Sequence, residues 1–166
     1  MKIFKEEQRF NQPWLIILML ISTIVPIGIY IKEYLENPEN FTNLEVIGFI
    51  FLILFASGFI FFFKLITRID ETGIHYKFFP FHRIFRVIQW NEIQKAYVRT
   101  YDPCGEYGGW GLKGGIFWDK PTGRAINVSG DIGIQLILKN GKKLLIGTQK
   151  QNDTKNVLAA YNTKIN

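Results

Sequence analysis

The sequence predicts an α-helical transmembrane hairpin followed by a mainly β domain. The domain is expected to be a barrel or bent sheet of six to seven antiparallel strands, closed by a C-terminal helix. Residues 14 to 31 and 46 to 63 form two apolar runs without a charge, whereas apolar and polar residues alternate with period 2 after residue 64. With 48% hydrophobic and 16% aromatic residues among 166, the composition excludes intrinsic disorder.

The first run, WLIILMLISTIVPIGIYI, is long enough to span a bilayer, for which the lower limit is about 17 residues. A cleaved signal peptide is the alternative. Its apolar region is usually only about 7–15 residues long, and a small-residue cleavage site follows it. Here Lys32 and Glu33 follow directly, which favours an uncleaved span, and Pro26 is expected to kink it.

The second run, VIGFIFLILFASGFIFFF, meets the same length criterion. A buried core helix is the alternative, but a chain this short cannot enclose such a helix on all sides. Neither run holds an ionisable residue, so the hairpin is expected to be an anchor rather than an ion pathway. The predicted organisation is an N-terminal flank at 1–13, the hairpin at 14–63 and the β domain at 64–166.

The charges predict the orientation of the hairpin. The loop between the spans, residues 32 to 43, is acidic, whereas the outer flanks are rich in Lys and Arg: Lys2, Lys5, Arg9, Lys64, Arg68, Lys77, Arg83 and Arg86. Positively charged flanks stay in the cytoplasm. Both termini and the β domain are therefore predicted to be cytoplasmic, on a multi-pass protein of the cytoplasmic (inner) membrane whose first partner is the lipid bilayer.

The strands are expected where apolar residues alternate between turn signals. The expected ranges are 65–70, 74–78, 83–90, 95–101, 125–129, 132–138 and 142–146. Asn140-Gly141 between the last two is a strong hairpin signal, because a type I′ turn needs positive φ at two positions.

The terminal helix is expected from residue 152 to about 162. Asn152 or Asp153 is the expected cap, and Val157, Leu158 and Tyr161 form one apolar face. This face is expected to cover one open end of the barrel.

The order of these elements, the IDETGI opening at 69–74, the IxWxxI pattern at 88–93 and the closing LILKNGKKLLIGTQK hairpin with its helix resemble bacterial pleckstrin-homology-like domains. In many small bacterial membrane proteins such a domain directly follows a two-helix membrane hairpin, which is the order predicted for this chain. The resemblance covers roughly residues 14 to 163 and implies an architecture more than an activity. The chain departs from the pattern at residues 102–124, which are longer and richer in glycine than a plain strand connection needs.

Six glycines lie within residues 105–115, GEYGGWGLKGG. They include a literal G-x-G-x-x-G, but no helix start follows it, so a dinucleotide site is not favoured. The segment is either a turned excursion or a recognition loop. In the second case the predicted binding residues are Trp110, Lys113, Trp118 and Arg124, with Trp110 as the exposed anchor. The expected partner is another membrane protein, a second copy of the chain or lipid head groups.

Residues 75–86, HYKFFPFHRIFR, allow two interpretations. In the first they form a strand, a turn and a return strand with alternate aromatic side chains in the core. In the second their basic side faces an anionic leaflet, and the predicted membrane-surface contacts are Lys64, Arg68, Arg83 and Arg86. From residue 64 onward sixteen Lys and Arg stand against eight Asp and Glu. A nearby membrane already accounts for this charge, so no nucleic-acid partner is expected.

The sequence favours a non-catalytic interaction module without a cofactor or a metal. It binds a protein partner or the anionic membrane surface. The single Cys104 excludes an intramolecular disulfide and a multi-Cys metal site, and two histidines are too few for a multi-His site. One alternative is an accessory subunit of a larger membrane complex. The other is a small membrane-bound enzyme that uses the 102–124 loop, with Cys104 or Ser129 placed against His75 or His82 in a pocket.

Overall fold

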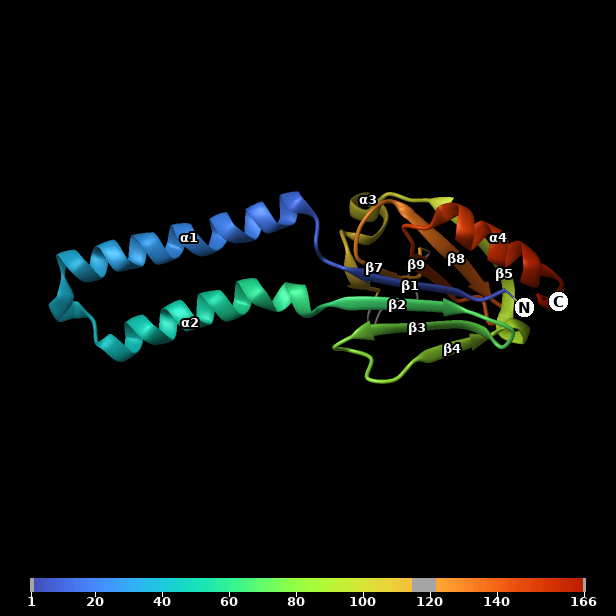
Figure 1. Ribbon diagram of the computed structural model, residues 1–166, viewed down its shortest axis with the longest axis horizontal. Coiled ribbons are helices and arrows are strands. Elements are labelled where there is room, and N and C mark those ends of the chain that lie inside the picture. The colour runs from blue at the N-terminus through green and yellow to red at the C-terminus, as the bar shows by residue number, and fades with distance from the viewer. Residues whose placement is uncertain (1, 115–121, 166) are drawn as a thin grey trace. The chain divides into compact units, whose positions relative to one another are not determined.

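The computed structural model describes residues 2–114 and 122–165. The chain divides into two compact units, a helical unit of residues 10–63 and a β unit of residues 1–9 and 64–166. The helical unit contains α1 (Pro13–Glu36), η1 (Pro38–Asn40), α2 (Asn43–Phe59) and η2 (Ile60–Phe62). Figure 1 shows α1 and α2 as a hairpin.

The two long helices have clear start signals. Pro13 is the first residue of α1, where its missing N–H costs no hydrogen bond. The start of α2 is a capping box, in which Thr42 N donates to Glu45 Oε2 at 2.8 Å and Glu45 N donates to the Thr42 hydroxyl at 3.4 Å. Tyr30 of α1 stacks on Phe49 of α2 with ring centroids 4.0 Å apart.

Both helices are long and apolar enough to cross a membrane, as judged from length and composition. Their apolar side chains are mostly exposed: only 6% of the most apolar stretch of the first helix is buried, and none of the second. Exposed apolar surface on this scale is unfavourable in water, so the helices support association with a membrane.

The β unit has two sheets (Figure 1). Sheet A is antiparallel in the order β1 (Phe4–Arg9), β2 (Lys64–Ile69), β3 (Gly73–Phe79) and β4 (Arg86–Gln89). Sheet B has the order β5 (Ile93–Thr100), β8 (Ile132–Leu138), β9 (Lys143–Gly147), β7 (Arg124–Asn127) and β6 (Gly111–Lys113). The remaining elements are η3 (Trp90–Glu92), α3 (Pro103–Tyr107), α4 (Gln151–Tyr161) and η4 (Asn162–Lys164).

This architecture corrects the prediction of a barrel or bent sheet of six to seven antiparallel strands. The described residues form nine strands in two sheets without a closed barrel, and β7 pairs with β9 in parallel. The additional strands are β1, in the predicted N-terminal flank, and β6, in the Gly-rich segment. The strand predicted at 83–90 is shorter, because β4 begins at Arg86.

Strand β1 was missed because its inward positions are polar. Phe4, Glu6 and Gln8 are buried, alternating with exposed residues. Glu6 accepts hydrogen bonds from the Thr148 hydroxyl at 2.6 Å and the Gln149 N–H at 2.8 Å. Besides pairing with β2, β1 is therefore bonded to the segment that follows β9.

The C-terminal helix α4 lies across the edge strands of both sheets, contacting β5, β1 and β8. Its predicted apolar face is confirmed, because Val157, Leu158 and Tyr161 are buried, and Tyr161 stacks on Trp90 at 5.2 Å between ring centroids. The predicted cap is wrong. The cap position is Lys150, with no side-chain cap bond, and the Lys150 N–H donates to the Thr148 hydroxyl.

Candidate functional site

The predicted binding residues of the Gly-rich segment bond to backbone carbonyls of the β unit. The indole N–H of Trp110 donates to Gly130 O at 3.0 Å, Lys113 Nζ to Gly108 O at 3.0 Å, and Arg124 Nε to Gly114 O at 3.2 Å. All three side chains are half-buried. Trp118 lies outside the described residues. These contacts favour a role in holding the loop backbone.

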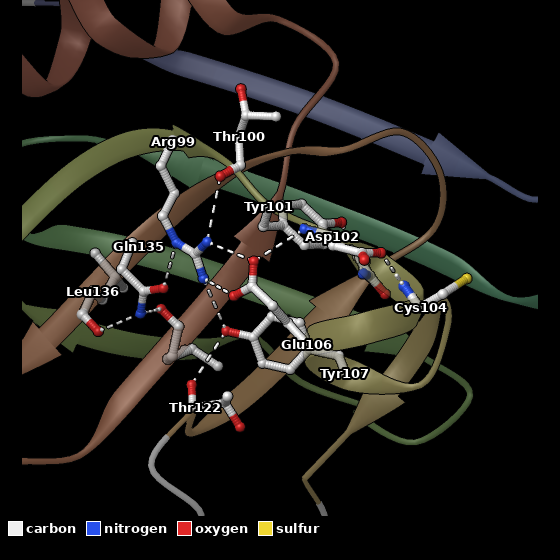
Figure 2. A network of polar contacts seen from close by, with 12 residues as sticks. Arg99, Thr100, Tyr101, Asp102, Cys104, Glu106, Tyr107, Thr122, Gln135 and Leu136 are labelled. Atoms are coloured by element: carbon white, nitrogen blue, oxygen red, sulfur yellow. Dashed lines mark hydrogen bonds and ion pairs between the residues drawn. The ribbon is translucent and has the colours of Figure 1, made fainter.

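Figure 2 shows the polar network that fixes this segment to sheet B. Arg99 of β5 bonds both carboxylate oxygens of Glu106, at 2.9 and 2.6 Å, and its Nε donates to Gln135 Oε1 at 3.0 Å. The hydrogen bonds from Arg99 hold the pKa of Glu106 below its ordinary value although burial acts in the opposite direction. The same carboxylate accepts the Asp102 N–H at 3.0 Å.

Two tyrosines extend the network. The Tyr107 hydroxyl donates to Thr122 O at 3.2 Å, and the Tyr101 oxygen accepts from Asn127 Nδ2 at 2.8 Å. Burial raises the pKa of Tyr101 to about 12, outweighing the bond from Asn127. Burial also raises the pKa of Tyr107, so both phenols stay neutral and serve as hydrogen-bonding groups. The described part of residues 102–124 is held in place by α3, β6 and this network.

The enzyme alternative needed a histidine beside Cys104 or Ser129. Cys104 is exposed, and Ser129 is buried with its hydroxyl accepting from the Gln149 amide. His75 Nε2 instead lies 3.0 Å from Asp70 Oδ1, and His82 Nδ1 accepts the Phe78 N–H at 3.3 Å. Within residues 2–114 and 122–165, neither histidine bonds either nucleophile, and no group of three His, Cys, Asp or Glu is placed to hold a metal.

The connection between β3 and β4 displays large apolar side chains. We call residues 79–85 the apolar loop. Phe81 is 60% exposed and Ile84 79%, and Phe79 and Phe85 are also exposed, whereas Phe78 is buried. The aromatic residues of this region are therefore split between core and surface, as the first interpretation of the sequence expected.

The first part of the apolar loop is a defined turn. The His82 N–H donates to Phe78 O at 2.8 Å, and the ring of Phe81 stacks on that of Phe78 at 5.9 Å between centroids. Burial lowers the pKa of His82, with a further contribution from the charges of Arg86 and Arg124, so the ring is neutral near pH 7. The turn thus presents Phe81 on a backbone closed by a hydrogen bond, and the imidazole of the next residue, His82, is buried and neutral.

Strand register places the apolar loop at a particular end of sheet A. Phe79 pairs with Lys64, and Lys64 pairs with Arg9. The chain enters α1 four residues after Arg9 and leaves η2 two residues before Lys64. The loop therefore lies at the end of the sheet that is joined to the apolar helices through both connections.

The four predicted membrane-surface cations differ in their surroundings. Lys64 is paired with Glu7 at 2.8 Å, and Arg68 forms an ion pair with Asp70, with Nε 3.0 Å from Oδ2. Arg83 and Arg86 are exposed and form no ion pair within the described residues. Sequence reasoning missed Lys5, whose place on the same face as Arg68 follows only from the pairing of β1 with β2.

Comparisons with protein-family models, with curated proteins and with solved structures give no match. The pleckstrin-homology-like resemblance therefore stays a prediction, and function is argued from the surface of this chain.

Proposed function

We propose that the protein is a membrane-anchored, non-catalytic interaction module whose β unit contacts the anionic surface of the membrane. The contact is made by the apolar loop together with Arg83 and Arg86. The observation that carries this proposal is the exposure of Phe81 and Ile84 close to those cations in sequence, at the sheet end joined to two apolar helices.

The energies favour such a contact. Burying one Phe or Ile side chain stabilises by roughly 1.5–3 kcal/mol, and each Lys or Arg near an anionic leaflet contributes about 1 kcal/mol. Because the β unit is tethered by the helices, this contact is intramolecular, and the effective concentration of the partner surface is about millimolar or higher. Partial insertion of two apolar residues is then sufficient for stable contact.

The membrane is the cytoplasmic membrane of a bacterium, with both termini and the β unit in the cytoplasm. The Lys and Arg bias of the flanks supports this orientation. It also places the exposed cations beside the cytoplasmic leaflet, which carries the anionic lipids.

An environment-sensitive fluorophore on the apolar loop tests the proposal. The background is Cys104→Ser, which removes the one natural cysteine. The label is placed at Phe81→Cys and, as a control, at Lys95→Cys on exposed β5. In nanodiscs containing phosphatidylglycerol, we expect the label at position 81 to shift to the blue and to resist an aqueous quencher. The label at position 95 should remain quenchable.

Nanodiscs of phosphatidylcholine alone should weaken the protection at position 81, because the contribution from the cations is lost. Equal quenching at positions 81 and 95 in the anionic nanodiscs would overturn the proposal. A photoreactive label at position 81 could be used in place of the fluorophore. Specific crosslinks from it to a protein, and not to lipid, would instead indicate a membrane-protein partner or a second copy.

A further inference from the structure

A second feature of sheet A is a cavity of about 410 Å³ in the β unit. It is lined by Ile3, Lys5, Arg68, His75 and Phe85. Three of the five side chains are basic and the other two are apolar. The cavity is thus a basic site with an apolar wall.

The three basic residues form one row across three strands. Lys5 of β1 pairs with Arg68 of β2, and Arg68 pairs with His75 of β3. Paired residues of antiparallel strands project to the same face, and neighbouring strands lie about 4.8 Å apart. The row therefore spans about 10 Å, enough for a single anionic group to contact more than one of its members.

Asp70 contacts two members of the row. Its Oδ2 lies 3.0 Å from Arg68 Nε in an ion pair, and its Oδ1 lies 3.0 Å from His75 Nε2 and accepts the Thr72 N–H at 2.9 Å. The Asp70 side chain is only 8% exposed, so its carboxylate is occupied by these protein partners and is little exposed to a ligand.

Arg68 and Lys5 are two side chains that can donate hydrogen bonds to a ligand. Within the described residues the ammonium of Lys5 forms no ion pair, and the ion pair of Arg68 is made through Nε. Lys5, Arg68 and Asp70 together carry one net positive charge.

We propose that this cavity binds a phosphate monoester attached to an apolar body. Arg68 offers its terminal N–H groups as a fork that matches two phosphate oxygens, and Lys5 adds a point charge. Ile3 and Phe85 then cover the apolar body.

A phospholipid head group of the phosphatidic acid type and a soluble organic phosphate share this chemistry. The lipid source rests on the proposed function, because it needs the β unit to reach the membrane, whereas the soluble source does not.

Binding to the full chain in neutral detergent tests the inference, with four probes measured by calorimetry. These are inorganic phosphate, phenyl phosphate, dihexanoyl phosphatidic acid and dihexanoyl phosphatidylcholine. We expect at least one of the two monoesters to bind about tenfold more tightly than inorganic phosphate, since its apolar body is buried. Phosphatidylcholine should bind weakly, because its phosphate carries one charge and is shielded by choline.

The two sources give different results. Phosphatidic acid binding more than tenfold more tightly than phenyl phosphate assigns the site to a lipid head group. Comparable affinities, or tighter binding of phenyl phosphate, assign it to a soluble organic phosphate.

Lys5→Gln and Lys95→Gln are matched variants with the same charge change, and both lysines are exposed. We expect Lys5→Gln to weaken monoester binding about tenfold, the loss of one charge-assisted bond, and Lys95→Gln to change it less than twofold. Arg68→Lys, which keeps the charge but removes the fork, should also weaken binding. A thermal melt of each variant confirms that it is folded.

Three results would overturn the inference. They are no binding of either monoester, equal losses in Lys5→Gln and Lys95→Gln, or phosphatidylcholine binding as tightly as phosphatidic acid. Phe85 belongs to both the cavity and the apolar loop, but none of these results depends on the label at position 81, which is read in nanodiscs. The fluorophore experiment thus fails or succeeds independently of this one.

Discussion

At the scale of single residues, the buried carboxylate of Glu6 holds the N-terminal strand in place. It is 4% exposed and accepts two hydrogen bonds, from Thr148 and Gln149. Removing it leaves the Gln149 N–H without a partner and takes the carboxylate acceptor from the buried Thr148 hydroxyl, which keeps its contact with the Thr154 hydroxyl. Each lost bond costs about 1–3 kcal/mol. Strand β1 therefore depends on a residue type that is rarely buried.

We predict that Glu6→Ala lowers the free energy of unfolding of the β unit by about 3 kcal/mol. Its neighbour gives the control, since Glu7→Ala removes a partly exposed carboxylate whose ion pairs contribute about 0–1 kcal/mol. Urea unfolding of the full chain in detergent, followed by tryptophan fluorescence, measures both. Similar losses at positions 6 and 7 would contradict the role given to Glu6.

Asp70 makes the stability of the β unit depend on pH. Burial raises the pKa of its carboxyl, but hydrogen bonds from Thr72 and His75 outweigh this effect and hold the pKa well below its usual range. A carboxyl with a depressed folded-state pKa stabilises the protein above its unfolded pKa of about 3.9, and this contribution is lost as the pH falls.

We predict that Asp70→Asn lowers the melting temperature most at pH 6–7, and that the gap to the natural chain shrinks steadily below about pH 4. Calorimetric melts of both proteins between pH 7 and pH 3 measure the gap. A gap that stays constant over this range would show that the ionised form of Asp70 contributes no stability.

Residue patterns predicted the apolar core well and the polar interior poorly. Ile74, Leu136 and Ile146 lie on predicted strands and are fully buried, because alternation of apolar residues identifies an inward face. Glu6 and Gln8 are equally inward, but their hydrogen-bond partners, Thr148 and Gly147, are distant in sequence, and alternation does not show such partners.

At the scale of elements, α4 joins the two sheets by packing on the edge strands β1 and β5. Leu158 is 6% exposed on the packed face, whereas Lys155 lies exposed on the same helix. Truncating a buried Leu removes its transfer free energy and leaves a cavity.

We predict that Leu158→Ala destabilises the β unit by about 2–4 kcal/mol, and that Lys155→Ala changes its stability by less than about 0.5 kcal/mol. Both variants keep a good helix former, so helix propensity does not separate them. Urea unfolding of the full chain measures the two values. A loss below 1 kcal/mol in Leu158→Ala would show that α4 is not part of the cooperative core.

The elements that could be predicted are those with strong local signals. The two long helices have long apolar runs, and the β8–β9 hairpin has Asn140-Gly141. The expected type I′ turn is wrong, because Gly141 has φ 81° but no described residue other than glycine has positive φ. Strand β6 and helix α3 had no such signal, because their order depends on Arg99 and Asn127 from strands distant in sequence. For residues 75–86 the sequence predicted that alternate aromatic residues lie in the core, but only the register of sheet A shows at which end of the sheet the exposed ones lie.

At the scale of the whole molecule, the helical unit is inserted between two paired strands. Arg9 ends β1 and Lys64 begins β2, and these two residues are partners in the register of sheet A. Both connections must therefore lie on the same side of a membrane that the helices cross. The number of crossings is then even, so the two candidate helices cross the membrane together or not at all.

Cys104 reports the side of the membrane, because it is the one cysteine of the sequence and is exposed on the β unit. We predict that a membrane-impermeant maleimide leaves Cys104 unlabelled in intact bacterial spheroplasts and labels it after permeabilisation. The reason is the excess of Lys and Arg around residues 9 and 64, which keeps those flanks in the cytoplasm.

Asn40→Cys in a Cys104→Ser background is the matched control, since residue 40 lies in the connection between α1 and α2. It should be labelled in intact spheroplasts if that connection is outside. The reverse pattern would invert the orientation and place the apolar loop at the outer leaflet. Labelling at neither position before permeabilisation would show that the helices do not cross the membrane. Because the number of crossings is even, both flanks lie on the same side of the membrane, and maleimide labelling of Cys104 shows which side that is.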